Sequence, residues 1–495
     1  MVIAMESDTS STQRPVIQAS EILAKIERGE DVEYDGVIVE GDLDISGLEL
    51  RTVHVERTDR ELRQGLSSDL KEVQSEIIIV NSDIRGKINF SNVCFKKTVR
   101  LSRDNRSRRS SIVIFAHYVN FRGTKFDTNA TFSGVKFNCA SFMRTKFSGD
   151  ANFNGVKFVE DVDFTKAEFS REAIFQQAKF GGKARFGEVQ FGAKTNFMFA
   201  EFNKYAGFGE AQFSGKANFQ QATFGDKVWF LGVVFRKDTD FIETKFKGDS
   251  HFIKATFCRD NKFMDAQFGG KADFREATFR KETDFTGAKF YAQIIFIRLK
   301  FNILYIDWTS IKDNLVYDGP AYLALIKNFK VIEQFSDADD CHYQYRKKSQ
   351  ARKKWFDKKR FNWSKLLDWI GFVSCGYGVK ILPIIFWVLG SVLGFTLLYK
   401  LLPPSYGGIA ASGPSTVTME AVNNSTLLFT FSSGDGVISP SWGECLYFSF
   451  TALTGGTPDG LHPVGLVKYA VMVESVLGYL FLALFVVVLA RKIIR

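Results

Sequence analysis

The sequence predicts a multidomain chain in which a right-handed β-solenoid precedes an α-helical membrane domain. Three observations lead to this prediction: an eleven-residue phenylalanine repeat, two apolar segments long enough to cross a bilayer, and a dense run of cations before the first of them. The chain has 495 residues, of which 51 are Phe, and its net charge of +10 is unevenly placed. Because 45% of the residues are hydrophobic, the chain has ample apolar surface to bury, which excludes general intrinsic disorder.

The order of these features predicts the domain organisation. We expect a disordered N-terminus (1–14), a helix cap with the solenoid start (15–115), a Phe-rich solenoid (116–303), a helical linker with a basic interfacial helix (304–370), and a membrane domain (371–495) with spans at about 381–402 and 468–490 and a short helix at about 442–453.

The N-terminal cap is predicted from an amphipathic pattern in residues 15–32. Ser20 is a candidate N-cap and Gly29 a candidate C-terminal stop. Alternating residues at 32–46 indicate the first strand, and the polar stretch 51–75 indicates an insertion.

The Phe repeat identifies the central domain. From Phe153 to Phe301 the spacing alternates between five and six residues, which makes fourteen units of eleven residues with all 28 positions Phe. Phe residues five apart would lie about 140° apart on a helix, so a helix would split them into two stripes. A β-solenoid instead directs Phe, and the small residue three positions after the first Phe of nearly every unit, into its core. We expect two inward columns of Phe.

Two units per coil would give seven coils, with a length of about 34 Å at about 4.8 Å per coil. A coil of about 20 residues, out of phase with the Phe pattern, would contradict this hypothesis.

The repeat resembles the pentapeptide-repeat family, whose units place Leu or Phe centrally and Ala two positions earlier, as in Ala277/Phe279 and Ala288/Phe290. The extra residue in every second step departs from that family's square coil. Some members mimic DNA with an acidic surface, whereas residues 121–301 hold 29 Lys/Arg and 21 Asp/Glu, which argues against mimicry. We also expect no nucleic-acid binding, because the charges are mixed and no aromatic-basic readout motif is present.

Two helices are predicted after the repeat, at 317–335 with Pro320 near its start and at 336–363. Residues 346–365 carry ten Lys/Arg and one acid among several aromatic residues. This composition favours an interfacial helix that binds anionic lipid, and an ordinary solvated flank of a membrane span is the alternative.

Two segments are long enough to span a membrane. Ile381–Tyr399 has no charge, and Tyr469–Ala490 has only Glu474. Cations precede the first segment and follow the second, while the stretch between Lys400 and Lys468 has none. The positive-inside rule therefore predicts a multi-pass plasma-membrane protein with both termini in the cytoplasm.

The connection between the spans contains a further short helix. Ser441-x-x-Glu444 is a capping box in front of an apolar run that is too short to span a bilayer. The run ends at Thr454-Gly455-Gly456, where the backbone must leave the helix. A short apolar helix followed by Gly-rich backbone is what a re-entrant pore loop requires.

Residues 380–495 resemble the pore of the two-transmembrane potassium-channel superfamily, whose filter reads Thr-Val-Gly-Tyr-Gly-Asp. Thr454, Gly456 and Asp459 match this filter, whereas Gly455, Thr457 and Pro458 depart from it. Because Pro has a fixed negative φ and no N–H, the outer half of the filter is expected to be remodelled. The resemblance implies a homotetrameric pore for monovalent cations such as potassium and sodium, and the departure argues against strict potassium selectivity.

The second span resembles the inner helix of that family. Gly478 stands where the family has a hinge Gly, and a packing role is equally supported. Glu474 is expected to have a structural partner on the pore helix or behind the filter rather than to form a charged ring facing the pore. Leu482, Phe485 and Leu489 are expected to line the cavity and form a hydrophobic gate.

These observations favour a cation channel with four Asp459 carboxylates at its outer mouth and a cytosolic solenoid that scaffolds or gates it. The solenoid is either a rigid scaffold or a sensor of a cytosolic ligand or protein. A non-conducting, membrane-anchored interaction scaffold is the alternative function. We expect neither an enzyme nor a cofactor, and no metal beyond the permeant cations, because the sequence has no catalytic constellation, no phosphate loop and only scattered Cys and His.

Overall fold

The structure is a computed structural model that describes residues 14–63, 66–102, 113–357, 360–402, 408–412, 416–421, 427–432, 435–437, 440–456 and 460–493. The chain divides into two compact units, Met1–Asp337 and Ala338–Arg495, which are described separately. The segment predicted to be disordered lies outside the described residues, apart from Arg14.

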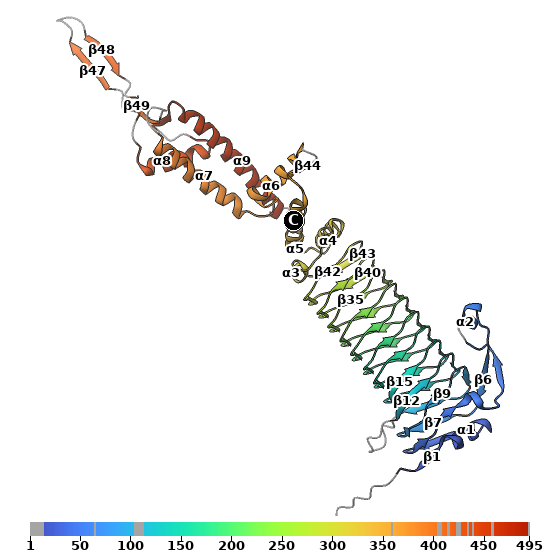
Figure 1. The fold of residues 1–495 in the computed structure, drawn as a ribbon. Coiled ribbons are helices and arrows are strands. Elements are labelled where there is room, and N and C mark those ends of the chain that lie inside the picture. Colours follow the sequence, from blue (N-terminus) through green and yellow to red (C-terminus); the bar gives the residue numbers. More distant parts are fainter. Residues whose placement is uncertain are drawn as a thin grey trace, which may run out of the picture. The chain divides into compact units, whose positions relative to one another are not determined.

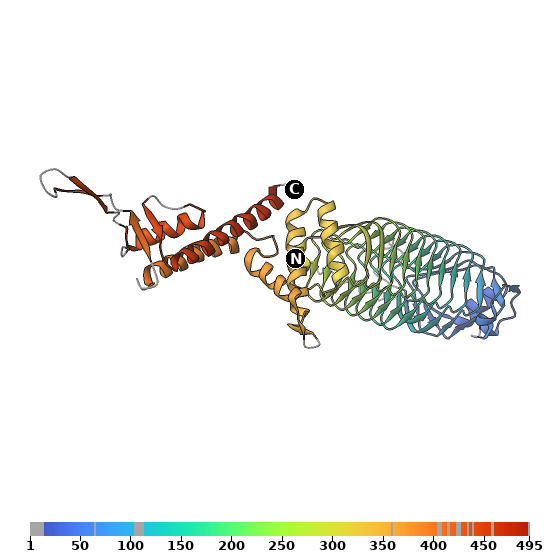
Figure 2. The ribbon, with the colours of Figure 1, turned by 90° about the horizontal axis from the view of Figure 1, so that it is seen from above.

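The first unit is a β-solenoid whose coils stack on one another (Figures 1 and 2). Its first coils contain β1 (Val16–Gln18), β2 (Val32–Asp35), β3 (Ile38–Glu40), β4 (Leu43–Asp44), β7 (Ile77–Val80), β8 (Asp83–Ile84), β9 (Ile88–Asn89), β10 (Val93–Phe95), β11 (Val99–Ser102) and β12 (Ile114–Asn120). From β13 (Lys125–Phe126) to β42 (Ile294–Ile295) nearly every strand has two residues.

The coil length agrees with the Phe repeat. Strand β18 (Lys157–Phe158) pairs in parallel with β22 (Lys179–Phe180), and β22 pairs with β26 (Glu201–Phe202). Residues Lys179 and Glu201 are separated by 22 positions, which is two units of eleven. The hypothesis of two units per coil is therefore confirmed for this array.

The Phe side chains form four columns rather than the two that we predicted. Phe175 stacks on Phe153 and Phe197, with ring centroids 4.9 and 4.8 Å apart, which matches the spacing of adjacent strands. Phe175 also meets Phe164 and Phe186 edge to face at 5.5 and 5.6 Å. Each unit has two Phe residues and each coil has two units, so every coil contributes four Phe side chains, one to each column of the core.

A left-handed residue turns the chain once in every unit. At one corner the Ala167 N–H donates to the Phe164 carbonyl oxygen at 2.9 Å, and Lys166 between them has a φ of 59°. The same position recurs every eleven residues, at Gly155, Lys166, Gln177, Glu188, Phe199, Glu210, Gln221, Gly232, Glu243, Lys254, Asp265, Glu276, Gly287 and Arg298. The sequence does not indicate this left-handed corner, because most of the residues that occupy it are not Gly.

The N-terminal helix begins differently from our prediction. Strand β1 keeps the backbone extended through Gln18 because it pairs with β3, and α1 (Ala19–Glu27) follows directly. Ser20 therefore lies inside the helix and is not its N-cap. Gly29 takes a φ of +73° just after the helix, as expected for a stop.

The predicted insertion is an arm that is shorter than expected. The arm comprises residues 51–63 and 66–68 and carries β5 (Thr52–His54) and α2 (Asp59–Arg63). Strand β6 (Asp69–Val73), which we placed in the insertion, pairs in parallel with β10 of the next coil and so belongs to the solenoid. Strand β5 pairs antiparallel with β6, which attaches the arm to the coil.

Helices cover the C-terminal end of the solenoid. After β43 (Lys300–Tyr305) come α3 (Trp308–Ile311) and α4 (Gly319–Val331), whose start at Pro320 was predicted. The buried Asn328 side chain accepts from the Leu304 N–H at 3.0 Å and donates to the Leu304 carbonyl at 2.7 Å. The Asn328 side chain thus satisfies the two Leu304 backbone groups that a strand of a further coil would otherwise bond.

The second unit contains most of α5 (Phe335–Arg352), α6 (Trp363–Cys375), α7 (Leu382–Leu401), α8 (Trp442–Leu453) and α9 (Val467–Ile493). The helix predicted at 336–363 ends at Arg352, and a hairpin of β44 (Phe356–Asp357) and β45 (Arg360–Phe361) precedes α6. Helix α6 also crosses our predicted domain boundary after residue 370.

The connection between α7 and α9 is not purely helical, so the expectation of an all-α membrane domain is wrong. Strand β46 (Ile409–Ser412) pairs antiparallel with β49 (Asp435–Val437) and β50 (Leu461–Pro463). Strands β47 (Thr416–Ala421) and β48 (Leu427–Ser432) form a hairpin. β-Branched residues such as Val417 and Thr418 of β47 favour the extended backbone of a strand.

Candidate functional site

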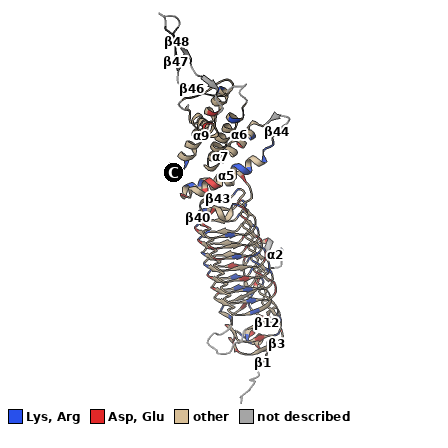
Figure 3. Cartoon of the chain, turned by 90° about the vertical axis from the view of Figure 1, so that its left-hand side faces the viewer, with Lys and Arg blue, Asp and Glu red and all other residues tan. Residues whose placement is uncertain are grey.

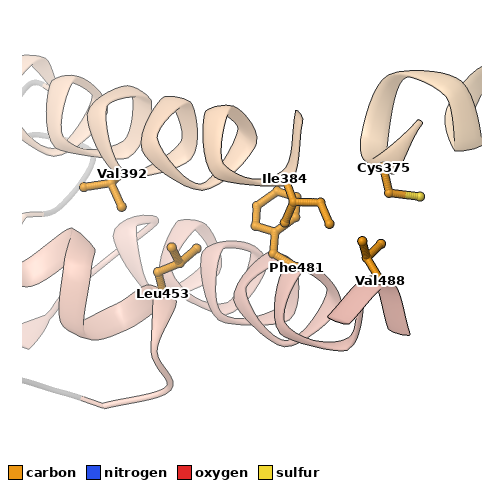
Figure 4. Packing of buried hydrophobic residues seen from close by; sticks show 6 residues of the cluster. All are labelled: Cys375, Ile384, Val392, Leu453, Phe481 and Val488. Atoms are coloured by element: carbon orange, nitrogen blue, oxygen red, sulfur yellow. The ribbon is translucent and has the colours of Figure 1, made fainter. Parts of the chain in front are cut away.

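Helix α8 packs against both α7 and α9, the two helices of the described residues that are long and apolar enough to cross a membrane. Figure 4 shows the core between them, where Leu453 at the end of α8 faces Val392 of α7 and Phe481 of α9. The same cluster continues through Ile384 and Val488. The three helices therefore share one apolar core.

The start of α8 is the predicted capping box. The Glu444 N–H donates to Ser441 Oγ at 3.2 Å, and the Ser441 N–H donates to Glu444 Oε2 at 2.6 Å. Two N–H groups without intrahelical partners are thus satisfied, so the helix begins at Trp442. The bounds of α8 coincide with the predicted 442–453.

Beyond Leu453 the backbone leaves the helix as the sequence indicates. Gly455 has a φ of +80°, and the Gly456 N–H donates back to the Thr451 carbonyl at 2.8 Å. This positive φ favours Gly, and a Cβ on Gly455 would also displace the Tyr479 hydroxyl, which would lie 2.5 Å away. Thr457, Pro458 and Asp459 lie outside the described residues.

Glu474 joins all three helices. It lies on α9 with no exposed surface, and its carboxylate accepts from the Ser449 hydroxyl of α8 at 2.5 Å and from the Tyr399 hydroxyl of α7 at 2.6 Å. Within this chain Glu474 thus has a hydrogen-bond partner on the short helix, Ser449, and its side chain is fully buried.

Gly478 has a packing role. A Cβ at this position would overlap the Leu453 carbonyl oxygen, which is a backbone atom with little freedom to move. One turn earlier, the Ser475 hydroxyl donates to the Ala452 carbonyl at 2.8 Å. Helix α9 therefore approaches the end of α8 closely, and α9 runs through Gly478 without interruption.

Two of the three predicted gate residues border one groove. Leu482 and Phe485 line an apolar groove of about 390 Å³ together with Thr454 and Gly478. Leu489 is half-buried and does not line it.

Sequence reasoning missed two residues of this site, Ser449 and Tyr399. A single Ser inside the apolar run of α8 and a Tyr at the end of the first span were the available signals. Neither signal identifies a partner, because Tyr399 and Glu474 are 75 positions apart.

The described residues of the chain contain no group of three or more His, Cys, Asp or Glu arranged to hold a metal ion.

The exposed surface of α7 and α9 is strongly apolar. Exposed large side chains include Phe386, Leu389, Leu393, Leu397, Met472, Val476, Leu480, Val486 and Val487. Such a surface fits lipid or other subunits rather than water.

The solenoid matches the family described as Pentapeptide repeats (9 copies), in three overlapping stretches, 199–244, 219–265 and 241–289. All three stretches lie within the array of 22-residue coils, where the resemblance was predicted. No curated protein and no solved structure matches the chain. These residues therefore carry pentapeptide repeats in a β-solenoid.

Proposed function

We propose that this protein is a cation channel in which α8 is a re-entrant pore helix and four chains surround one pore. The observation that carries the proposal is the capped α8, which is too short to span a bilayer and packs between two membrane-length helices. A non-conducting anchor requires only the two spanning helices, and it leaves α8 and its Gly-rich end without a role.

The chemistry at the end of α8 suits a cation. A helix C-terminus carries the equivalent of about half a negative charge, which attracts cations. The backbone from Thr454 to Gly456 then leaves the helix, so its carbonyl groups would be available to replace the hydration shell of potassium or sodium. Asp459 would add one carboxylate per chain at the outer mouth. Pro458 argues against strict selectivity for potassium.

The Glu474 contacts would hold the pore helix in place. Each filter must keep its carbonyl groups aligned, and the hydrogen bonds to Ser449 and Tyr399 connect α8 to both spanning helices. The groove beside Leu482 and Phe485 would face a neighbouring subunit or the inner cavity. In this proposal Leu482, Phe485 and Leu489 form the hydrophobic gate on the cytoplasmic side of the filter.

The basic segment and α6 would lie at the cytoplasmic surface of the membrane. Helix α6 exposes Trp363, Leu367 and Trp369, which are suited to the headgroup region. Two cations of the segment, Arg346 and Lys353, pair with the buried Asp368 at 2.7 and 2.5 Å and so stabilise the fold. The exposed Lys347 and Lys354 of the same segment would meet anionic lipid.

Single-channel recording of the purified full-length protein in planar bilayers tests the proposal. We expect cation current, with a smaller conductance in Asp459→Asn and an unchanged conductance in Glu420→Gln, an acid elsewhere in the same connection. Reversal potentials with potassium on one side and sodium on the other would measure selectivity. Absence of current would favour the non-conducting membrane-anchored scaffold. Equal effects of the two variants on the conductance would contradict the placement of Asp459 at the outer mouth.

A further inference from the structure

The arm (residues 51–63 and 66–68) forms a cleft with the side of the solenoid. The cleft has a volume of about 590 Å³, within the range of about 300–1,000 Å³ that is typical of small-molecule sites. Arm residues 55–58 form one wall. The opposite wall consists of positions from four consecutive coils: Gly123, Thr124, Lys125, Arg144, Lys146, Lys166, Glu168, Glu188 and Gln190.

The arm is held against the solenoid by specific contacts. The Arg57 guanidinium donates to the Gly123 carbonyl at 3.3 Å, and the Ser67 N–H donates to Asn92 Oδ1 at 3.4 Å. Leu66 is 3% exposed, and a Cβ on Gly123 would lie 2.7 Å from its side chain. The cleft is therefore a built feature of the solenoid rather than a gap beside a detached loop.

Cations outnumber carboxylates in this cleft. Five Lys or Arg side chains line it, one from the arm and four from the coils, against three Glu side chains. Two of these carboxylates are engaged in ion pairs, Glu168 with Lys146 and Glu188 with Lys166, each at 3.2 Å. Lys125 pairs with Asp127 at 2.7 Å, so the lining residues together with Asp127 carry five cations and four carboxylates.

The strand register places like charges directly beside each other there. Strand β13 pairs with β16 (Lys146–Phe147) so that Lys125 lies opposite Lys146, at the strand spacing of about 4.8 Å. Like charges directly opposite each other destabilise a ladder. Each of these two lysines also has a carboxylate partner, Asp127 for Lys125 at 2.7 Å and Glu168 for Lys146 at 3.2 Å. Ion pairs between residues 22 positions apart recur along the solenoid, as between Lys179 and Glu201, and Figure 3 shows both signs of charge along its sides. An anion bound between the arm and these lysines would compete with the two carboxylates for the ammonium groups.

We propose that this cleft binds a small soluble molecule with two or more phosphate charges. Lysine ammonium groups supply compact positive charge, and the Arg57 and Arg144 guanidinium groups match phosphate oxygens. The inference goes beyond the channel proposal and does not depend on it, because it concerns binding to the solenoid alone.

The solenoid also provides a matched control. On the other ladder Lys157 lies between Lys136 and Lys179 in the same in-register arrangement. None of these three residues lines the cleft under the arm. Lys157→Gln therefore removes a charge from an equivalent lysine ladder without changing the cleft.

Isothermal titration calorimetry of the full-length protein in detergent at low salt, with inorganic pyrophosphate as the probe, tests this site. We expect saturable binding of one pyrophosphate per chain, weakened about tenfold by Lys146→Gln and unchanged by Lys157→Gln. Arg57→Ala, which alters the arm and leaves the coils intact, should weaken it similarly if Lys146→Gln impairs folding. Absence of saturable binding, or equal weakening by Lys157→Gln, would overturn the proposal. No ion flow is measured, so failure here leaves the channel proposal intact, and the reverse also holds.

Discussion

Replacing one phenylalanine of the solenoid core tests the packing argument most directly. Phe208 has no exposed surface and stacks between Phe186 and Phe230, with ring centroids 4.9 and 5.0 Å away. It also meets Phe197 and Phe219 edge to face at 5.7 and 5.8 Å. Phe202 and Phe213 lie further away, at 6.0 and 6.5 Å, so the Phe208→Ala substitution would remove six ring contacts and leave a cavity in the core of a coil.

The expected cost follows from this burial. Truncating a buried Phe to Ala typically costs about 3–5 kcal/mol. A repeat of a solenoid contacts mainly its neighbours, so the loss should concentrate in the coil of Phe208 and the coils beside it. Since each 1.4 kcal/mol is a factor of ten, amide hydrogens there should exchange roughly 100- to 4,000-fold faster.

Hydrogen exchange of the full-length protein, measured by mass spectrometry, is the suitable assay. Phe199 provides the control, because it is 42% exposed at a left-handed corner with a φ of 58°. The Phe199→Ala variant should change the free energy of opening by less than about 0.5 kcal/mol. Equal exchange rates in the two variants would refute the assignment of the Phe columns as the stabilising core.

Two further predictions concern other parts of the chain. Gly478→Ala should destabilise the helical unit by about 1–3 kcal/mol, because the added methyl group meets the Leu453 carbonyl. Gly394→Ala is the control and should be tolerated, since no atom lies within 4 Å of its added Cβ. Thermal unfolding in detergent compares the two variants, and equal melting temperatures would contradict the close packing at Gly478. His251 is buried against Trp229 near Asp273, and burial lowers the pKa of its imidazole from the ordinary value of 6.5, although the Asp273 charge opposes this effect. Because the folded-state pKa is lowered, the unfolded chain takes up the proton first, so stability is present above about pH 6.5 and falls as the pH drops through that value. His251→Phe should reduce the change in solenoid melting temperature between pH 7.5 and 5.5 that circular dichroism measures in the natural chain, and an unchanged pH dependence would contradict the assignment.

Several features of this protein follow from local sequence pattern alone. The period of eleven between Phe153 and Phe301 predicted the solenoid and its two-unit coil, because stacked coils must bring equivalent residues into register. The capping box at Ser441 and Glu444 predicted both ends of α8, since it and the following glycines act within one or two turns. The two apolar segments predicted the membrane-length helices for the same local reason.

Other features were decided only by the tertiary structure. The pattern predicted two Phe columns, and four exist because the coil places alternate units on different sides. The left-handed corner was hidden because residues such as Lys166 and Glu188 occupy it in place of Gly, and the surrounding stack stabilises that conformation.

The two candidate sites were also decided by the tertiary structure. Glu474 meets Tyr399 from 75 positions away, and Arg57 of the arm meets Gly123 from 66 positions away. Residue spacing indicates which face of a helix or coil a side chain occupies, but it does not indicate which distant segment covers that face. The repeats and the two membrane-length helices were therefore determined by the sequence itself, whereas the buried carboxylate network and the cleft under the arm arise from long-range packing.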